Sequence, residues 1–220
     1  APTAPGRAQT PAPKKPTPAA PPLPQAVRWE SAIARFEALD RQMLPPQGAV
    51  LFVGSSSIVR WKTLAEDFPG VVTLNRGFGG SVLADTTRYV SRIVVPYNPR
   101  KIVIFAGDND IAGGRSPEAV VADFAGFVSL VRKSLPDVPI VFIGIKPSPS
   151  RWKMREAQEK ANRLVSDYCG RSTGLTFVDV YRPMLGGDGL PRTELFVADR
   201  LHMSPAGYAI WTPLVAPLIK

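Results

Sequence analysis

The feature that most constrains the fold of this chain is an alternation of short apolar runs with longer amphipathic stretches. The runs are mostly Val, Ile and Phe, a composition typical of strands that are buried on both faces of a parallel sheet. Alternating strands and helices predict a three-layer α/β/α sandwich with right-handed crossovers. The five expected strands are residues 49–53, 71–74, 101–106, 138–145 and 175–180.

The stretches between the runs carry helix signals. The Ser-Pro-Glu sequence at 116–118 combines an N-cap, a first-turn proline and an acid near the positive end of a helix. The Ser-Pro pair at 204–205 repeats this signal and starts a last helix that is expected to reach Trp211. Further helices are expected at residues 28–40, 82–95 and 154–168.

The beginning of the chain differs in composition from the rest. Residues 1–25 contain nine of the 24 prolines and almost no large apolar side chains. Such a segment buries too little surface to offset the entropy cost of ordering it. We therefore expect residues 1–27 to be a disordered Pro/Ala-rich spacer and residues 28–220 to be one domain. A proline-rich ligand for a partner domain is the alternative interpretation of the spacer.

The net charge of +9 bears on partners and location. Four cations precede the first acid, Glu30, and the remaining excess is spread out without a Lys/Arg run. Nucleic-acid binding is therefore not expected, whereas weak attraction to anionic envelope surfaces or acidic polysaccharide fits the charge. No apolar stretch is long enough to span a bilayer. The first residue is Ala, as after removal of an export signal, so we expect a periplasmic or secreted protein, with the cytoplasm as the alternative.

Polar and glycine-rich segments follow the expected strands. In open parallel sheets the ligand site forms at the carboxyl ends of the strands. The first such loop contains three serines at 55–57, close to the start of a helix that favours negative charge. The second contains glycines at 77, 79 and 80, which let backbone amides approach a ligand. In the third, Asn109 can direct an amide donor into the same cleft.

The chain has one histidine, His202, in the segment that follows the last expected strand. Any Ser–His mechanism must therefore use His202 as its base. Asp199, three positions earlier, can hold the other ring nitrogen and stabilise the imidazolium. A surface histidine beside a chance aspartate is the simpler interpretation of this pair taken alone. The only cysteine, Cys169, is expected to be a small buried side chain.

Four blocks of the sequence, VGSSSI, NRGFGGS, AGDND and DRLHMSPAGY, resemble those of the SGNH (GDSL-type) hydrolases in order and spacing. The resemblance covers residues 48–212 and implies a flavodoxin-like fold and ester hydrolysis without a cofactor or metal. By position it implies that Ser56 is the nucleophile and that His202 and Asp199 complete the triad. It also implies an oxyanion hole made by the amides of Ser56 and Gly80 and the side chain of Asn109.

One residue departs from the family pattern. The Asp that usually precedes the nucleophile is Ser55 in this chain. Ser55 and Ser57 therefore remain alternative nucleophiles. A turn in which these hydroxyls bind only local backbone is the structural alternative for the loop.

The neighbours of the expected site allow further interpretations. Asp108 and Asp110 flank Asn109, and we interpret them as carboxylates that brace the loop through backbone amides, in preference to a metal or glycosidase pair. Arg151 and Trp152 follow the fourth expected strand and are expected to contact substrate, or else to cover the rim of the sheet. Nothing in the sequence indicates an oligomeric state.

These features together predict a serine esterase that hydrolyses short-chain acyl esters, acetyl esters above all. The substrate is expected to be a small acyl ester or an acylated glycan, derived from carbohydrate or lipid, because no long apolar lid segment is evident. Transfer of the acyl group to another alcohol stays open. Two alternatives from other classes are a flavin- or phosphate-binding protein of flavodoxin-like fold and a catalytically silent glycan-binding module.

Overall fold

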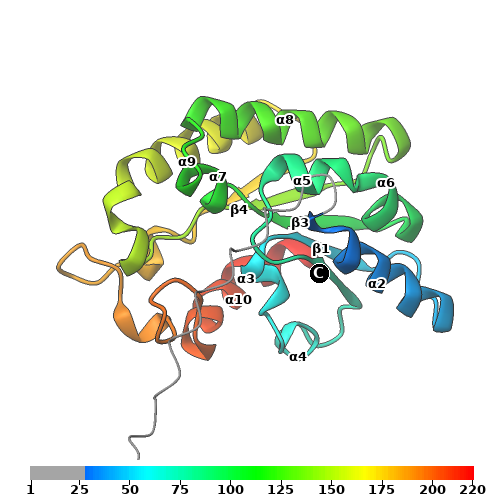
Figure 1. Ribbon diagram of the computed structural model, residues 1–220, viewed down its shortest axis with the longest axis horizontal. Helices are drawn as coiled ribbons and strands as arrows, with labels where there is room; N and C mark the ends of the chain where they lie inside the picture. Colours follow the sequence, from blue (N-terminus) through cyan, green and yellow to red (C-terminus); the bar gives the residue numbers. More distant parts are fainter. Residues whose placement is uncertain (1–27) are drawn as a thin grey trace, which may run out of the picture.

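A five-stranded parallel sheet forms the centre of the protein in a computed structural model, which describes residues 28–220 (Figure 1). The strand order is β2-β1-β3-β4-β5, so the chain begins inside the sheet and moves to one edge and then to the other. This reversal opens a crevice at the carboxyl ends of the strands. The strands are β1 (Val50–Gly54), β2 (Thr73–Gly77), β3 (Lys101–Phe105), β4 (Ile140–Ile143) and β5 (Leu175–Val178).

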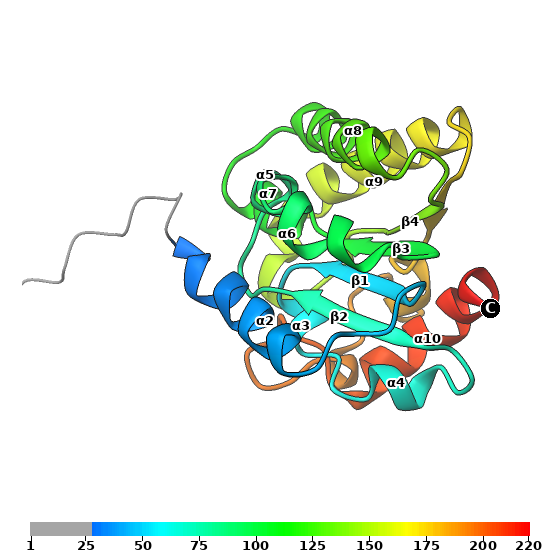
Figure 2. The same cartoon turned by 90° about the vertical axis from the view of Figure 1, so that its right-hand side faces the viewer.

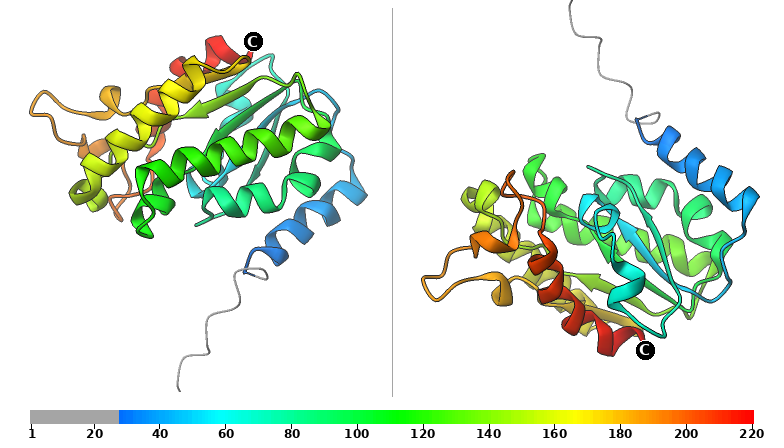
Figure 3. Two further views of the ribbon diagram at one scale, coloured as in Figure 1. Left: turned by 90° about the horizontal axis from the view of Figure 1, so that it is seen from above. Right: turned by 90° about the horizontal axis from the view of Figure 1, so that it is seen from below.

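Helices cover both faces of the sheet, as Figure 2 shows with the strands seen between the two layers, and Figure 3 shows the two helical faces in turn. This arrangement confirms the predicted three-layer α/β/α sandwich. The apolar core is accordingly divided into one cluster on each face. One face carries α2 (Glu30–Gln42), α5 (Leu83–Arg88), α6 (Val90–Ile93), α8 (Pro117–Ser134) and α9 (Arg155–Gly170). The other carries α3 (Ser56–Val59), α4 (Leu64–Asp67) and α10 (Pro205–Ile219).

Five short elements lie at the ends of the strands or between helices. The helix α7 (Asp108–Ala112) follows β3, and the remaining four are 3₁₀ turns. These turns are η1 (Val95–Tyr97), η2 (Pro149–Met154), η3 (Arg182–Met184) and η4 (Thr193–Leu195). The predicted spacer, residues 1–27, lies outside the residues that the structure describes.

The inner strands β1, β3 and β4 are buried along almost their whole length, which agrees with their apolar sequences. The second strand differs from its expected position at 71–74. It pairs with β1 in the register Val50↔Thr73 to Gly54↔Gly77, so this ladder, and not the apolar pair before it, fixes its ends. As a result, residues 75–77 belong to the strand and the glycine-rich loop begins at Phe78.

The two predicted N-caps are present. Ser116 Oγ accepts a hydrogen bond from the Ala119 amide at 3.2 Å, and Ser204 Oγ accepts one from the Gly207 amide at 3.4 Å. The last helix continues beyond its expected end, through two prolines, to Ile219. A proline inside a helix is costly, but this helix buries Trp211 and later apolar residues against the sheet.

The helix expected at 82–95 consists of two short helices, α5 and α6, which are separated at Tyr89. Both bury apolar side chains against the sheet. Within residues 28–220, no helix combines the length and the apolar character that crossing a membrane requires.

Candidate active site

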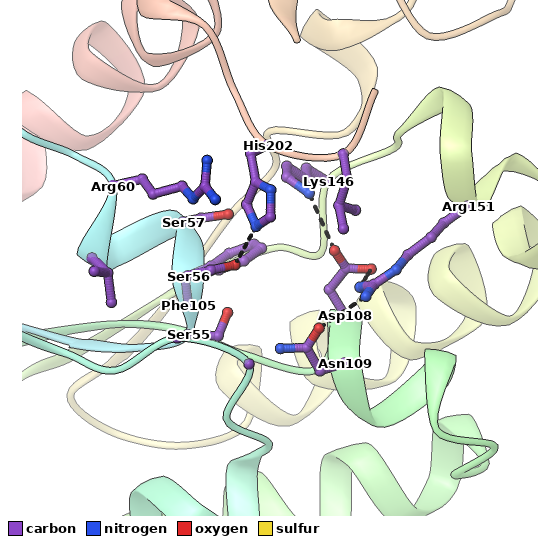
Figure 4. A pocket seen from close by; sticks show the side chains of 14 residues that line it. Ser55, Ser56, Ser57, Arg60, Phe105, Asp108, Asn109, Lys146, Arg151 and His202 are labelled. Atoms are coloured by element: carbon purple, nitrogen blue, oxygen red, sulfur yellow. Dashed lines mark hydrogen bonds and ion pairs between the residues drawn. The ribbon is translucent and has the colours of Figure 1, made fainter. Parts of the chain in front are cut away.

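Loops that follow all five strands meet at the carboxyl end of the sheet and line one pocket of about 360 Å³ (Figure 4). The loops after β1, β2, β3 and β5 bring together Ser56, Gly80, Asn109 and His202. These residues are up to 146 positions apart in the sequence. The pocket is therefore where the sequence predicted that chemistry would occur.

All three serines of the loop after β1 line the pocket, but only one of them contacts the histidine. Gly54 has a φ of +124°, and a Cβ at this position would lie 2.0 Å from the carbonyl oxygen of Phe105, so only glycine fits here. The chain then turns sharply into α3. Ser55 and Ser57 are only 2% and 3% exposed, whereas Ser56 is partly exposed and its Oγ lies 2.9 Å from Nε2 of His202.

The imidazole of His202 is held by its own loop. Nδ1 lies 2.6 Å from Oδ2 of Asp199. The other carboxylate oxygen accepts hydrogen bonds from the backbone amides of Leu201 and His202, both at 2.9 Å. The side-chain hydrogen bond from His202, together with these amides, lowers the pKa of Asp199 well below its ordinary value.

An ionised Asp199 fixes the tautomer of the imidazole. The carboxylate can only accept, so Nδ1 carries the proton that it shares with Asp199. Nε2 is then free to accept a proton from the hydroxyl of Ser56. This arrangement can remove a proton from Ser56 and carry the resulting positive charge.

Two backbone amides at the pocket are available as donors. Among residues 28–220, no acceptor is hydrogen-bonded to the backbone N–H of Ser56 or of Gly80. Gly80 has a φ of +76°, which favours glycine, and a Cβ there would lie 3.3 Å from the ring of Trp29. The two N–H groups belong to loops that line the same pocket.

The amide side chain of Asn109 has a fixed orientation. Its Nδ2 donates to the carbonyl of Ser81 at 3.0 Å, and its Oδ1 accepts from Nη2 of Arg151, also at 3.0 Å. A flipped amide would place its NH₂ group against the guanidinium. The second N–H of Nδ2 therefore remains for a ligand in the pocket.

Asp108 lies at the centre of a buried charged cluster beside Asn109. Its carboxylate contacts Lys146 Nζ at 3.1 Å, Arg151 Nη1 at 2.9 Å and Gln158 Nε2 at 3.1 Å. Burial acts to raise the pKa of Asp108, but the charges of Lys146 and Arg151 outweigh it and lower the pKa below its ordinary value. We expected Asp108 to brace its loop through backbone amides, but its carboxylate binds side chains instead. These side chains belong to the segments that follow β4.

Asp110 does brace the loop as the sequence predicted. Its carboxylate accepts hydrogen bonds from the backbone amides of Leu83 and Gly107, both at 3.1 Å. The side chain is fully buried. Burial, opposed by these amides, raises the pKa of Asp110 to about 6.

The two residues expected to contact substrate lie in different places. Arg151 lines the pocket, but its guanidinium is bound to Asp108 and Asn109. Trp152 is not among the residues that line the pocket; its ring packs against the guanidinium of Arg155, 5.5 Å away.

Two cations that line the pocket were not predicted from the sequence. Lys146 follows β4, so its position at a strand end was the signal that could have found it. Arg60 follows α3 directly, and no pattern in the sequence marks it.

Known proteins share this fold. The family model described as GDSL-like Lipase/Acylhydrolase matches residues 47–210. No curated protein matches the chain with significance. A GDSL-like lipase from Bacteroides thetaiotaomicron has a similar structure, with a TM-score of 0.71, 21% identity, and coverage of 85% of this chain and 96% of that chain.

Two other solved structures are similar. A protein from Streptococcus pneumonia named for platelet activating factor has a TM-score of 0.77 at 19% identity, covering 89% of this chain and 94% of its own. A carbohydrate esterase of family 3 from Talaromyces cellulolyticus has a TM-score of 0.63 at 16% identity, with coverage of 77% and 95%. At these identities the likeness shows a common fold.

Proposed function

Because this chain belongs to the GDSL-like lipase/acylhydrolase family of carboxylic ester hydrolases, we propose that it is a serine esterase with Ser56 as nucleophile, His202 as base and Asp199 as the third member of the triad. One observation carries the proposal. Ser56 Oγ, the two nitrogens of the single imidazole and the Asp199 carboxylate form one chain of contacts at 2.9 Å and 2.6 Å. The alternative binding functions leave this chain of contacts without a role.

Acylation begins when Ser56 Oγ attacks the ester carbonyl while Nε2 of His202 takes the hydroxyl proton. Asp199 stabilises the imidazolium that forms. The negative charge that develops on the carbonyl oxygen accepts hydrogen bonds from the N–H groups of Ser56 and Gly80 and from Nδ2 of Asn109. His202 then gives its proton to the departing alcohol, and the acyl group stays on Ser56.

Deacylation repeats these steps with water. His202 removes a proton from the water molecule, whose oxygen attacks the acyl carbonyl. The same three donors stabilise the second oxyanion. When this intermediate collapses, Ser56 recovers its proton from His202 and the carboxylic acid leaves.

The size of the pocket supports a small acyl group. Its volume of about 360 Å³ is shared between the acyl group and part of the alcohol, and small-molecule sites range from ~300 to ~1,000 Å³. Acetyl esters, on carbohydrate or on lipid-derived alcohols, suit such a volume. The likeness to a carbohydrate esterase adds support for a sugar alcohol.

A series of 4-nitrophenyl esters from acetate to octanoate tests the proposal. The rate is expected to be highest for acetate and to fall with chain length. Ser56→Ala should reduce kcat by about 10⁴-fold or more while the circular dichroism spectrum stays that of the wild type. Ser57→Ala, which removes the neighbouring hydroxyl, should leave far more of the turnover. Wild-type activity in Ser56→Ala would remove this serine from the nucleophile's role.

A further inference from the structure

The charges that line the pocket are unequal in number. Three cations, Arg60, Lys146 and Arg151, face one carboxylate, Asp108. With a neutral His202 the lining therefore has an excess of positive charge. An excess of this kind raises the local concentration of anions in a pocket with low-dielectric walls.

The three cations differ in whether a carboxylate neutralises their charge. Lys146 and Arg151 share the single carboxylate of Asp108, at 3.1 Å and 2.9 Å, so this cluster holds one positive charge more than it can neutralise. Arg60 is exposed, and its guanidinium makes no hydrogen bond or ion pair with any other residue between 28 and 220. Its guanidinium has donors in a fork that matches the two oxygens of a carboxylate or phosphate.

The position of Arg60 shows which part of an ester it faces. In Figure 4, Arg60 and Lys146 flank His202, with the Arg60 side chain directed toward the pocket. The departing alcohol must receive its proton from His202, so the alcohol part of the ester lies beside the imidazole. The carbonyl oxygen lies instead toward Asn109 and Gly80. Arg60 thus lies on the imidazole side of the pocket, where the alcohol departs.

We propose that Arg60, together with the excess positive charge of the Lys146–Asp108–Arg151 cluster, forms a subsite for an anionic group on the alcohol part of the ester. The substrate class is an acyl ester of an alcohol that also carries a carboxylate or a phosphate, such as an acetylated acidic sugar. This inference rests on the proposed esterase function and adds the charge of the substrate to it. A neutral alcohol would leave the guanidinium of Arg60 without a partner.

Matched aryl acetates test the subsite. 4-Acetoxybenzoate carries a carboxylate, 4-acetoxyphenyl phosphate carries a phosphate, and the methyl ester of 4-acetoxybenzoate is neutral. The measured quantity is the ratio of kcat/KM for each anionic ester to kcat/KM for the neutral ester. Arg60→Gln is expected to lower this ratio about tenfold, the loss expected for one charge-assisted hydrogen bond.

Lys62→Gln is the control variant. It also removes one exposed positive charge, two residues further along the chain, but Lys62 does not line this pocket. The control should change the ratio by less than about twofold, because exposed charges outside the site are screened. A loss on either anionic ester that is confined to Arg60→Gln supports the subsite, and the ester with the larger loss identifies the preferred anion. An unchanged ratio in Arg60→Gln, or an equal loss in Lys62→Gln, overturns it.

A binding measurement separates this subsite from the catalytic proposal. The Ser56→Ala variant should bind intact 4-acetoxybenzoate, and calorimetry gives its Kd with and without the additional Arg60→Gln change. A Kd that is about tenfold weaker in the double variant supports the subsite, even if the wild type cleaves none of the esters, a result that would refute only the esterase. An identical Kd in both variants overturns the subsite while leaving the esterase intact.

Discussion

The two sides of the pocket hold their functional side chains in different ways. His202 is held by Asp199, which lies three positions away on the same loop and is 43% exposed. Asn109 is held by Ser81 and Arg151, which lie 28 and 42 positions away. Arg151 in turn binds Asp108, whose side chain is only 5% exposed.

The imidazole of His202 and the amide of Asn109 are held by different kinds of interaction. On the histidine side, one carboxylate accepts hydrogen bonds from the imidazole and from two amides of its own loop, so a few neighbouring residues suffice. On the asparagine side, a buried carboxylate needs several cationic and polar partners from distant segments, because a buried charge without partners is very costly. The first arrangement depends only on residues of one loop, and the second depends on segments that the fold brings together.

The largest effect is expected on the local side, from Asp199→Asn. An amide in this position can donate to Nδ1, which leaves Nε2 protonated and unable to accept the proton of Ser56. We expect kcat to fall by about 10³–10⁴-fold, whereas the midpoint of urea denaturation should hardly change because the carboxylate is exposed. Steady-state kinetics and urea denaturation check both parts. A loss of activity below tenfold would show that the loop holds His202 without its carboxylate.

The next largest effect is expected from Asn109→Ala on the other side of the pocket. This change removes one of three oxyanion donors and leaves the triad in place. We expect kcat to fall by about 10²–10³-fold, with a much smaller change in KM, because the donor acts mainly on the charge of the transition state. A kcat close to that of the wild type would remove Asn109 from the site.

Variants of Arg151 test how the asparagine side of the pocket is held, because the sequence predicted that Arg151 contacts substrate. If it instead orients the Asn109 amide, Arg151→Met should lower kcat about tenfold with little change in KM. Arg151→Lys should recover part of the loss, since an ammonium can replace one of the two contacts but not both. A substrate contact would give the opposite result, a raised KM with kcat preserved.

The stability of Arg151→Met is the control for interpreting its effects on kcat and KM. Asp108 loses one cation but keeps Lys146 and Gln158. The variant should therefore remain folded, with a lower midpoint in urea than the wild type. Equal kinetic losses in Arg151→Met and Arg151→Lys would indicate general disturbance of the pocket.

Most of the fold follows from local patterns in the sequence. Continuous apolar runs predicted the buried strands, and Ser-Pro pairs predicted the starts of α8 and α10. The second strand was misplaced because its ends depend on pairing with β1, which has no local signal. The last helix ran past Trp211 because burial against the sheet outweighs the two prolines in it.

The same distinction between local and distant determinants applies to the site. The residues proposed for the triad and the oxyanion donors stand in short motifs; the structure brings all but Asp199 into one pocket, and Asp199 contacts His202 from outside it. The contacts of Asp108 with Lys146 and Gln158 join residues 38 and 50 positions apart, and no motif contains both partners. The contacts of Arg151 with Asp108 and Asn109 likewise join distant segments and have no motif, and its contact with substrate stays a prediction.

The smallest expected effect concerns two carboxylates whose pKa values shift in opposite directions. Hydrogen bonds lower the pKa of the exposed Asp199, whereas burial raises that of Asp110 from 3.8 to about 6. Between pH 3.8 and about 6, the folded protein binds a proton at Asp110 that the unfolded chain does not bind. The contribution of Asp110 to the free energy of unfolding therefore rises as the pH falls from about 6 to 3.8, whereas that of Asp199 is lost only as the pH falls below 3.8.

Asp110→Asn provides the comparison, because it removes the titrating group. The free energy of unfolding of the wild type, measured relative to this variant in urea, should increase by about 1 kcal/mol from pH 7 to pH 5. Carbon NMR of the Asp110 carboxyl in the wild type gives an independent measurement, which does not require the variant to fold. If the carboxyl titrates near its ordinary value of 3.8, the amides of Leu83 and Gly107 stabilise the charge as fully as water does. The pKa values of Asp110 and Asp199 would then no longer shift in opposite directions.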